Sequence, residues 1–360
     1  MKKICFLLGD INNFGGTERV TSIIANNLVG KEYDITIASM VDGDCPFFDL
    51  DKKVKFLSLS SSKSRSSFAL RIPLIIRNLR KVLIDNAIET LIVVDTISIM
   101  VSLPAVSGLK VRHIGWEHFN FKSNLNNRKR WFFRRVAARY FDTIITLTDR
   151  DKDFWLDNIF TKARIVTIPN PCPYPIQENN HSQTESHIVL AVGRLTYQKG
   201  FDMLLQAWKE VIKQKPEWKL EIVGDGEEAD NLKKYIDENE LNKSVRMVGK
   251  VSNTQDYYIK ADIFCLSSRF EGFPMVLLET LSFGIPVVSF NCDTGPEEIL
   301  KDTGSVLVPQ NDIRALSKEL ILLMNDKERR NTISCQSKIK AEEYHPSKIV
   351  NQWKKLLNDF

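Results

Sequence analysis

The chain has 360 residues, of which 43% are hydrophobic and 26% are charged, as is typical of a soluble globular protein. No apolar run approaches the roughly 20 residues that a membrane-spanning helix needs, so no such helix is expected. The net charge of +5 is unevenly distributed, because residues 1–168 carry 26 Lys and Arg against 17 Asp and Glu, whereas residues 169–360 carry 24 against 28. A basic half suits either nucleic acid or an anionic membrane surface.

The six cysteines are scattered, and no pair has the Cys-x-x-Cys spacing. We interpret them as reduced thiols of a cytosolic protein, because neither a disulfide framework nor a zinc site has this spacing. The N-terminal sequence MKKICFLLGD has a basic start, but its apolar run is only about five residues long and ends at Gly9. It predicts a first β-strand rather than a signal peptide.

Short apolar runs alternate with helical segments in the first half of the chain, which predicts a parallel sheet built from βαβ units. The predicted strands lie at about 4–10, 34–39, 54–59, 90–95, 111–118 and 143–148. The predicted helices lie at about 17–28, 70–85 and 127–140. Buried parallel strands are near-continuous apolar runs, and these runs have that character.

The second half repeats the same alternation and is therefore assigned to the same α/β class. Its predicted strands lie at about 187–195, 219–226, 245–250, 262–268, 286–290 and 305–309. Its predicted helices lie at about 201–214, 227–239 and 274–283. Between the halves, residues 169–187 hold four of the 13 prolines without a hydrophobic period, which predicts a linker.

The predicted fold is therefore two Rossmann-like doubly wound domains that face each other across a cleft. The N-terminal domain covers 1–168 and the C-terminal domain covers 188–345. A last helix follows at about 346–360, and its periodicity does not indicate where it packs. Ligands of such folds bind beyond the carboxyl ends of the strands, so the informative residues should follow strands directly.

The stretch from Ser267 to Gly284 has the strongest signal of a binding site. Glu271 lies in a loop after an apolar strand, and Glu279 lies in a helix otherwise made of Met, Val and Leu. A carboxylate is costly to bury without a partner, so Glu279 has either a core partner or a ligand. The free amides of a helix N-terminus attract anions, which favours a site for phosphate and hydroxyl groups.

Two other strand-end loops carry residues that suit phosphate. Arg194 and Lys199 lie five positions apart between two glycines, and a guanidinium with an ammonium can bind a diphosphate. The alternative is a solvated surface pair. The Gly15-Gly16 pair lets the backbone pass close to a ligand before a helix, although a simple turn is the commoner explanation.

His118 lies at the end of a predicted strand and could bond a hydroxyl or act as a base, with a structural role as the alternative. No HExxH, GxSxG or Walker A motif is present, and the Asp149/Asp151 pair opens a predicted helix. We therefore expect no metal site, because Arg194 and Lys199 can supply the positive charge.

Two stretches account for the basic first half, at 63–81 and at 122–139. Each is free of acids and mixes Lys and Arg with apolar or aromatic residues, which suits an interface with anionic lipid. We expect lipid contact to involve Arg134, Arg135 and Arg139. The alternative is a solvated helix face, and nucleic acid is not expected because no reader motif accompanies the charge.

In this order, the motifs resemble the retaining glycosyltransferases of family 4, which have the glycosyltransferase B fold. The resemblance extends from about residue 4 to about residue 320 and is closest to bacterial enzymes that add a hexose or N-acetylhexosamine to lipid-linked glycans. It is carried by GGTERV at 15–20, His118, VGRLTYQKG at 192–200, IVGDG at 222–226, EGFPMVLLE at 271–279 and GIPVVSF at 284–290.

The resemblance implies a role for each matching position. It implies that Gly15, Gly16, Arg194 and Lys199 hold the nucleotide diphosphate, and that Glu279 holds the ribose hydroxyls. The residues implied to contact the donor sugar are Glu271, His118 and the loop residues Gly272, Phe273, Met275 and Val276. It also implies that the last helix returns to the first domain.

The implied enzyme is a metal-independent transferase that retains the anomeric configuration. Its donor would be a UDP-sugar and its acceptor a lipid-linked or lipopolysaccharide glycan, such as an O-antigen, at the inner face of the cytoplasmic membrane. Sugar selection is expected near Asn291, Cys292 and Asp293. Two alternatives remain open, a nucleotide-sugar epimerase or isomerase of the same fold and a non-catalytic protein that binds sugar nucleotides.

Overall fold

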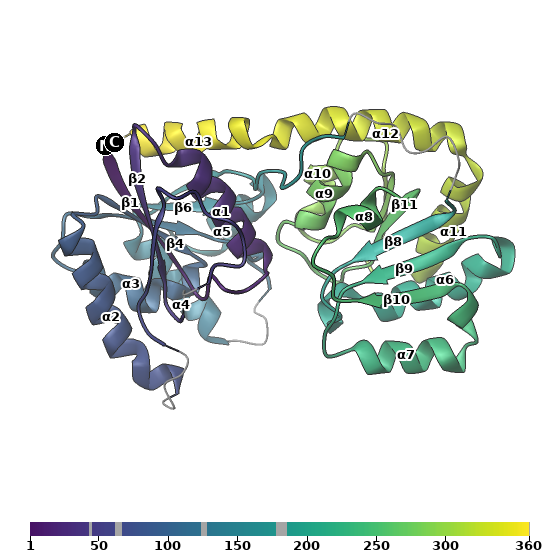
Figure 1. The fold of residues 1–360 in the computed structure, drawn as a ribbon, viewed down its shortest axis with the longest axis horizontal. Helices are drawn as coiled ribbons and strands as arrows, with labels where there is room; N and C mark the ends of the chain where they lie inside the picture. The colour runs from purple at the N-terminus through teal and green to yellow at the C-terminus, as the bar shows by residue number, and fades with distance from the viewer. Residues whose placement is uncertain (43–44, 62–66, 124–127, 178–185, 360) are drawn as a thin grey trace. The chain divides into compact units, whose positions relative to one another are not determined.

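The computed structural model describes residues 1–42, 45–61, 67–123, 128–177 and 186–359. Its contacts divide the chain into two compact units (Figure 1). Unit 1 comprises Met1–Pro173 and Pro346–Phe360, and unit 2 comprises Tyr174–His345. Residues 178–185 of the predicted linker lie outside the described residues.

Unit 1 is built on a seven-stranded parallel sheet with the order β3-β2-β1-β4-β5-β6-β7. The strands are β1 Lys2–Leu8, β2 Tyr33–Ser39, β3 Lys55–Ser58, β4 Thr90–Val94, β5 Arg112–Trp116, β6 Thr143–Thr146 and β7 Arg164–Thr167. The sequence analysis predicted the first six of these and missed β7. That strand is four residues long and only partly buried, so it lacks a continuous apolar run.

Helices cover both faces of this sheet (Figure 1). They are α1 Gly16–Leu28, α2 Phe68–Asp85, α3 Ile99–Val106, α4 Arg128–Tyr140, α5 Asp149–Asn158 and α13 Pro346–Asn358. Because successive side chains of a strand point to opposite faces, β1 contributes to two cores. Cys5 and Leu7 join the core that α2, α3, α4 and α5 cover, whereas Phe6 faces α13.

Helix α13 packs within unit 1, against α1. Its Trp353 is fully buried and meets the ring of Trp116 at 4.7 Å in an edge-to-face arrangement. Lys2 and Arg112 donate hydrogen bonds to carbonyls at its C-terminal end, at Leu357 (2.8 Å) and Leu356 (3.0 Å). The last helix therefore completes one layer of the N-terminal unit.

Unit 2 contains a six-stranded parallel sheet with the order β10-β9-β8-β11-β12-β13. Its strands are β8 Ile188–Val192, β9 Lys219–Val223, β10 Val245–Gly249, β11 Ile263–Leu266, β12 Val287–Phe290 and β13 Val306–Val308. Its helices are α6 Phe201–Gln214, α7 Ala229–Glu238, α8 Gln255–Tyr258, α9 Met275–Phe283, α10 Pro296–Leu300, α11 Ile313–Asn325 and α12 Lys327–Ala341.

The two parallel sheets confirm the predicted fold class of two Rossmann-like units. In each sheet the strand order reverses beside the first strand of the unit, β1 or β8, and ligands of doubly wound folds bind at such switch points. Loops that follow β1, β4 and β5 in unit 1, and β8, β11 and β12 in unit 2, are therefore the places to look for function. Among the described residues, no helix is long and apolar enough to cross a bilayer.

Candidate active site

In unit 2, the loops after β8 and β11 come together through a glycine. Gly200 adopts a φ of 63°, and a Cβ atom there would lie 2.1 Å from the carbonyl oxygen of Ser267. Only glycine fits this position without backbone movement. The Ser267 hydroxyl also donates to the Lys199 carbonyl at 2.9 Å. This close approach places the Lys199 loop against the loop that carries Glu271.

Glu271 and Lys199 form an ion pair at this junction. Lys199 Nζ lies 2.7 Å from Glu271 Oε1, and the Ser268 hydroxyl donates to the same oxygen at 2.6 Å. Glu271 is only 5% exposed, so its charge depends on these two partners. The structure thus joins two residues that the sequence analysis proposed independently, and it adds Ser268, which sequence reasoning missed.

The loop after β12 supports the Glu271 loop from the other side. Thr294 donates its hydroxyl to the Glu271 carbonyl at 2.7 Å, and the Cys292 thiol donates to the Ser268 carbonyl at 2.9 Å. Burial raises the pKa of Cys292, with the Glu271 charge acting in the same direction. Cys292 is therefore a neutral structural group. In the same loop, the side-chain oxygen of Asn291 is enclosed and has no hydrogen-bond partner among the described residues.

Arg194 is exposed and has no ion-pair partner in the part of the chain that the structure describes. It follows β8 directly, in the same short loop as Lys199. An exposed guanidinium with free donors can accept a phosphate without first breaking a protein contact. Of the two cations predicted to bind phosphate, Arg194 is therefore the more available, because Lys199 already binds Glu271.

Helix α9 begins directly after the Glu271 loop and ends at Gly284. Phe273 is buried and its ring lies 5.9 Å from that of Tyr344, so only its backbone is available to a ligand. Gly272, Met275 and Val276 are partly exposed around the helix start. The first-turn amides of a helix lack intrahelical partners and can bind an anion.

Glu279 lies further along α9 and has a buried partner. The hydroxyl of Tyr258 donates to Glu279 Oε2 at 2.6 Å. Tyr258 is fully buried and stacks on Phe283, with 5.3 Å between ring centroids. The partner of this carboxylate comes from α8, and no sequence motif pointed to it.

In unit 1, the Gly15-Gly16 turn leads from β1 into α1. A Cβ atom at Gly15 would lie 2.4 Å from Glu18 Oε2, so glycine lets the Glu18 side chain fold back over the turn. The Thr17 hydroxyl donates to the same carboxylate oxygen at 2.7 Å. The turn that was predicted to approach a diphosphate therefore also carries an acidic side chain.

His118 lies just beyond β5, as predicted. Its ring is 4.5 Å from that of Trp116, and its Nε2 atom is enclosed without a hydrogen-bond partner among the described residues. Burial lowers the pKa of His118 to about 4, although the charge of Glu117 acts in the opposite direction. The imidazole is therefore neutral near pH 7, suited to hydrogen bonding with a hydroxyl rather than to charge stabilisation.

Glu117, which sequence reasoning missed, anchors the loop that carries His118. It is 1% exposed, and its carboxylate contacts the Thr96 hydroxyl and accepts from the Phe119 amide at 3.0 Å. Arg134 Nε lies 3.5 Å from Oε2 and Arg130 Nη1 lies 3.6 Å from Oε1. Burial alone would raise the pKa of Glu117, but these two arginines hold it below its usual range.

Arg134 and Arg130 are internal residues, which corrects the prediction that Arg134 contacts lipid. Arg134 is fully buried and donates to the carbonyls of Asn120 (2.9 Å) and Phe121. Arg130 forms a bidentate pair with Asp95, at 2.9 and 2.8 Å. The prediction for Arg134 was wrong because the buried face of α4 carries arginines in place of apolar side chains.

Asp95, which follows β4, has a φ of 73° that side-chain-bearing residues rarely adopt. Its carboxylate also accepts from the amide of Ile97 at 3.2 Å. Backbone strain of this kind persists where surrounding contacts hold it, and it often occurs at functional sites. The loops after β4 and β5 are therefore held in one arrangement by buried charges.

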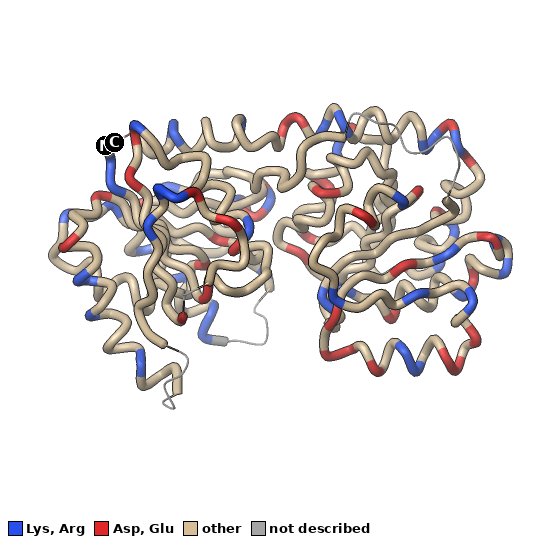
Figure 2. The backbone as a smooth tube through the Cα atoms, viewed as in Figure 1, with Lys and Arg blue, Asp and Glu red and all other residues tan. Residues whose placement is uncertain are grey.

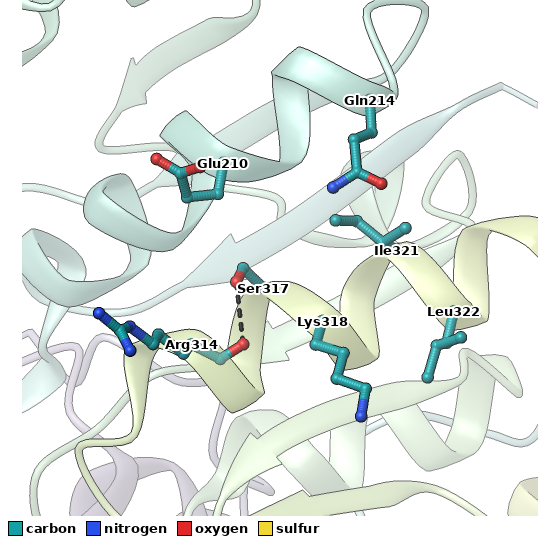
Figure 3. A pocket seen from close by; sticks show the side chains of 7 residues that line it. All are labelled: Glu210, Gln214, Arg314, Ser317, Lys318, Ile321 and Leu322. Carbon is teal, nitrogen blue, oxygen red and sulfur yellow. Dashed lines mark hydrogen bonds between the residues drawn. The ribbon is translucent and has the colours of Figure 1, made fainter.

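A separate surface pocket lies between α6 and α11, away from these loops (Figure 3). Its lining residues are Glu210, Gln214, Arg314, Ser317, Lys318, Ile321 and Leu322. None of them belongs to a strand-end loop.

Among the described residues, no group of three or more His, Cys, Asp or Glu side chains could hold a metal ion.

Comparisons with known proteins identify the family of this chain. Residues 14–173 match the family described as Glycosyltransferase Family 4, and residues 175–339 match the family described as Glycosyl transferases group 1. A relative from Haemophilus influenzae, named an uncharacterized glycosyltransferase, is 35% identical over 99% of this chain and 100% of its own length. The chain belongs to glycosyltransferase family 4. The protein is thus a glycosyltransferase, and the predicted family is confirmed.

Two further similarities are informative. A Campylobacter jejuni α-1,4-N-acetyl-D-galactosaminyltransferase, named for an undecaprenol-diphosphate-linked glycan, is 31% identical over 99% of this chain and 98% of its own. The solved structure of Anabaena HepE in complex with UDP and glucose has a TM-score of 0.81 at 16% identity and covers 100% of both chains. At that identity the likeness shows the fold alone, which is the glycosyltransferase B fold.

Proposed function

We propose that this family 4 enzyme is a retaining, metal-independent glycosyltransferase. It transfers a hexose or N-acetylhexosamine from a UDP-sugar to a lipid-linked or lipopolysaccharide glycan in the synthesis of a bacterial surface polysaccharide. The undecaprenol-linked glycan in the name of the Campylobacter relative and the UDP in the HepE structure support this choice of acceptor and donor. Because the relatives reported above are named as transferases, transfer is favoured over epimerisation.

The single observation that carries the proposal is the junction of Lys199 with Glu271 beside exposed Arg194. Cleavage of a sugar–phosphate bond places negative charge on the leaving diphosphate. A guanidinium, an ammonium and the amides at the start of α9 can stabilise that charge without a metal. Glu279 would then bind ribose hydroxyls with its carboxylate held by Tyr258.

For the chemical step we propose front-face displacement. The acceptor hydroxyl attacks the anomeric carbon from the side of the leaving diphosphate, the sugar–phosphate bond breaks, and the phosphate oxygen takes the acceptor's proton. Glu271 is held by Lys199 and Ser268, and in this scheme it binds the sugar rather than attacking it. Neutral His118 would hydrogen-bond a sugar hydroxyl.

Thermal unfolding of the purified protein with UDP, GDP and ADP, with and without EDTA, tests the donor site. A nucleotide at a hundred times its Kd should stabilise the protein by about 2.7 kcal/mol. We expect a shift that is selective for UDP and unchanged by EDTA. The absence of a shift with any nucleotide would contradict a nucleotide-binding donor site. NMR of the anomeric proton of the product tests retention, and a trapped glycosyl adduct on Glu271 would overturn front-face displacement.

We also propose that the enzyme binds the inner face of the cytoplasmic membrane through the outer faces of α2 and α4. Lys and Arg recur along these helices (Figure 2). On α2, Leu70 is 75% exposed, with Arg77 and Lys81 along the same helix. On α4, Phe132 is 59% exposed, next to the exposed pair in which Arg135 lies 3.6 Å from the ring of Trp131. Exposed apolar and cationic side chains together suit an anionic interface.

Only part of the predicted basic stretches supports this surface. Residues 63–66 and 124–127 lie outside the described residues, and Arg130 and Arg134 point inward. The test is therefore co-sedimentation of an Arg135→Glu/Arg139→Glu variant with phosphatidylglycerol vesicles. We expect reduced binding with unchanged UDP affinity, and the control is Lys233→Glu/Lys234→Glu on α7. Equal loss in both variants would contradict a specific role for α4.

A further inference from the structure

Three phenylalanine rings meet where the loops after β1 and β2 come together. Phe14 lies in the loop after β1, and Phe47 and Phe48 lie in the loop after β2. The ring centroids of Phe14 and Phe47 are 5.9 Å apart, and those of Phe47 and Phe48 are 5.1 Å apart in an edge-to-face arrangement. Phe14 is 49% exposed and Phe47 is 50% exposed. Single exposed apolar residues are common, but a contiguous aromatic cluster indicates an interaction surface.

Backbone hydrogen bonds hold the two loops together beneath these rings. The amide of Phe47 donates to the carbonyl of Ile11 at 3.3 Å, and the amide of Cys45 donates to the side-chain oxygen of Asn12 at 3.3 Å. The guanidinium of Arg19 lies 5.8 Å from the centre of the Phe48 ring. The rings are thus held at defined positions by contacts between the two loops and α1.

The position of the cluster also points to a ligand. Both loops follow parallel strands, so the rings lie at the carboxyl edge of the unit 1 sheet, where ligands of this fold class bind. Phe14 of the cluster directly precedes the Gly15-Gly16 turn. None of the residues implied to bind the donor belongs to the cluster, which leaves it available for another substrate.

The charged residues of these two loops indicate which chemical class of substrate the cluster suits. Residues 9–15 and 40–51 contain no Lys or Arg, and the aspartates described there are Asp10, Asp42, Asp49 and Asp51. Although Arg19 of α1 lies beside the Phe48 ring, these loops are less suited to an anionic membrane than the basic faces of α2 and α4. An uncharged sugar ring suits them, because its C–H face packs on aromatic rings and its hydroxyls donate to carboxylates.

We infer that Phe14, Phe47 and Phe48 form a stacking platform for an uncharged sugar residue of the glycan acceptor. The inference rests on the proposed function, in which the acceptor is a glycan. It deepens that function by naming an acceptor-binding surface and by assigning it a preference for neutral over acidic sugars.

Saturation-transfer NMR of the full-length protein tests this platform. The probes are methyl α-glycosides of glucose, galactose, N-acetylglucosamine and N-acetylgalactosamine, with methyl α-glucuronide as the anionic counterpart. We expect transfer to the ring C–H protons of at least one neutral glycoside, and weaker transfer to the glucuronide. Phe14→Ser and Phe47→Ser should each weaken binding about threefold to tenfold, the order expected for one aromatic contact. Phe160→Ser is the matched control, because Phe160 lies just beyond the C-terminal end of α5 and is 87% exposed.

Three results would overturn the inference. The first is the absence of saturation transfer to every neutral glycoside, and the second is equal transfer in Phe47→Ser and wild type. The third is that Phe47→Ser reduces binding of the protein to phosphatidylcholine vesicles but does not reduce binding of the glycosides. The UDP thermal shift keeps the two proposals separate. A protein that binds glycosides through these rings but does not respond to UDP would contradict the donor assignment and leave the platform intact.

Discussion

Lys199 Nζ lies 2.7 Å from Glu271 Oε1, although the two residues are 72 positions apart in the sequence. One follows β8 and the other follows β11, and these strands are neighbours in the unit 2 sheet. The close approach at Gly200 makes the pair possible. This ion pair therefore links the predicted phosphate-binding loop directly to the predicted sugar-binding carboxylate.

We expect Lys199→Met to destabilise the protein and to weaken UDP binding, because Glu271 would keep a nearly buried charge without its cation. Breaking a buried pair on one side costs about 3 kcal/mol. The double variant Lys199→Met/Glu271→Gln should recover part of the stability but not the affinity. Urea unfolding measures the first effect and calorimetric titration with UDP the second. Full additivity of the two single substitutions would contradict coupling.

Gly200→Ala should cost more stability than Gly249→Ala. Both glycines have positive φ, 63° and 83°, so both substitutions carry a backbone cost of about 1 kcal/mol. A Cβ atom at Gly200 would also meet the Ser267 carbonyl at 2.1 Å, whereas nothing lies within 4 Å of one at Gly249. We expect the Gly200 variant alone to lose UDP affinity as well. Equal melting temperatures for the two variants would show that the loops can separate without loss.

Glu117→Gln and Arg134→Met should each destabilise the protein by about 3–5 kcal/mol, because each leaves a buried charge without its partner. Arg139→Met is the control, since Arg139 is exposed on the same helix and should change stability by less than about 0.5 kcal/mol. Chemical unfolding measures these differences. If Arg134→Met unfolded like the control, the buried network would not support the His118 loop.

The pKa of His118 gives a prediction for acid conditions. In the folded state it is about 4, against about 6.5 for an unperturbed histidine. Between those pH values the unfolded chain binds a proton that the folded chain does not, so stability falls as the pH falls. Asp151, whose pKa burial raises to about 7, acts in the opposite direction. His118→Gln should therefore lose less stability than wild type between pH 6.5 and 4, measured by urea unfolding, and parallel losses would contradict the assignment.

Helix α4 shows where sequence reasoning reached its limit. Arg130 and Arg134 are four positions apart and lie inside, whereas Arg135 and Arg139 are also four positions apart and lie outside. Both pairs have helical spacing, so spacing alone does not tell which face is buried. The partners of the inner pair, Asp95 and Glu117, come from other strand ends and become visible only once β4 and β5 lie side by side.

The sequence by itself determined the two parallel-sheet units, the family, and the strand-end loops that carry Arg194, Lys199, Glu271 and His118. Local apolar runs and glycine-bracketed loops encode these features within a few residues. The tertiary structure decided which of the charged residues pair. Lys199 meets Glu271, Tyr258 meets Glu279, and Arg134 meets Glu117. These partners come from different elements, and the desolvation cost of each buried charge requires a partner that only the folded chain can supply.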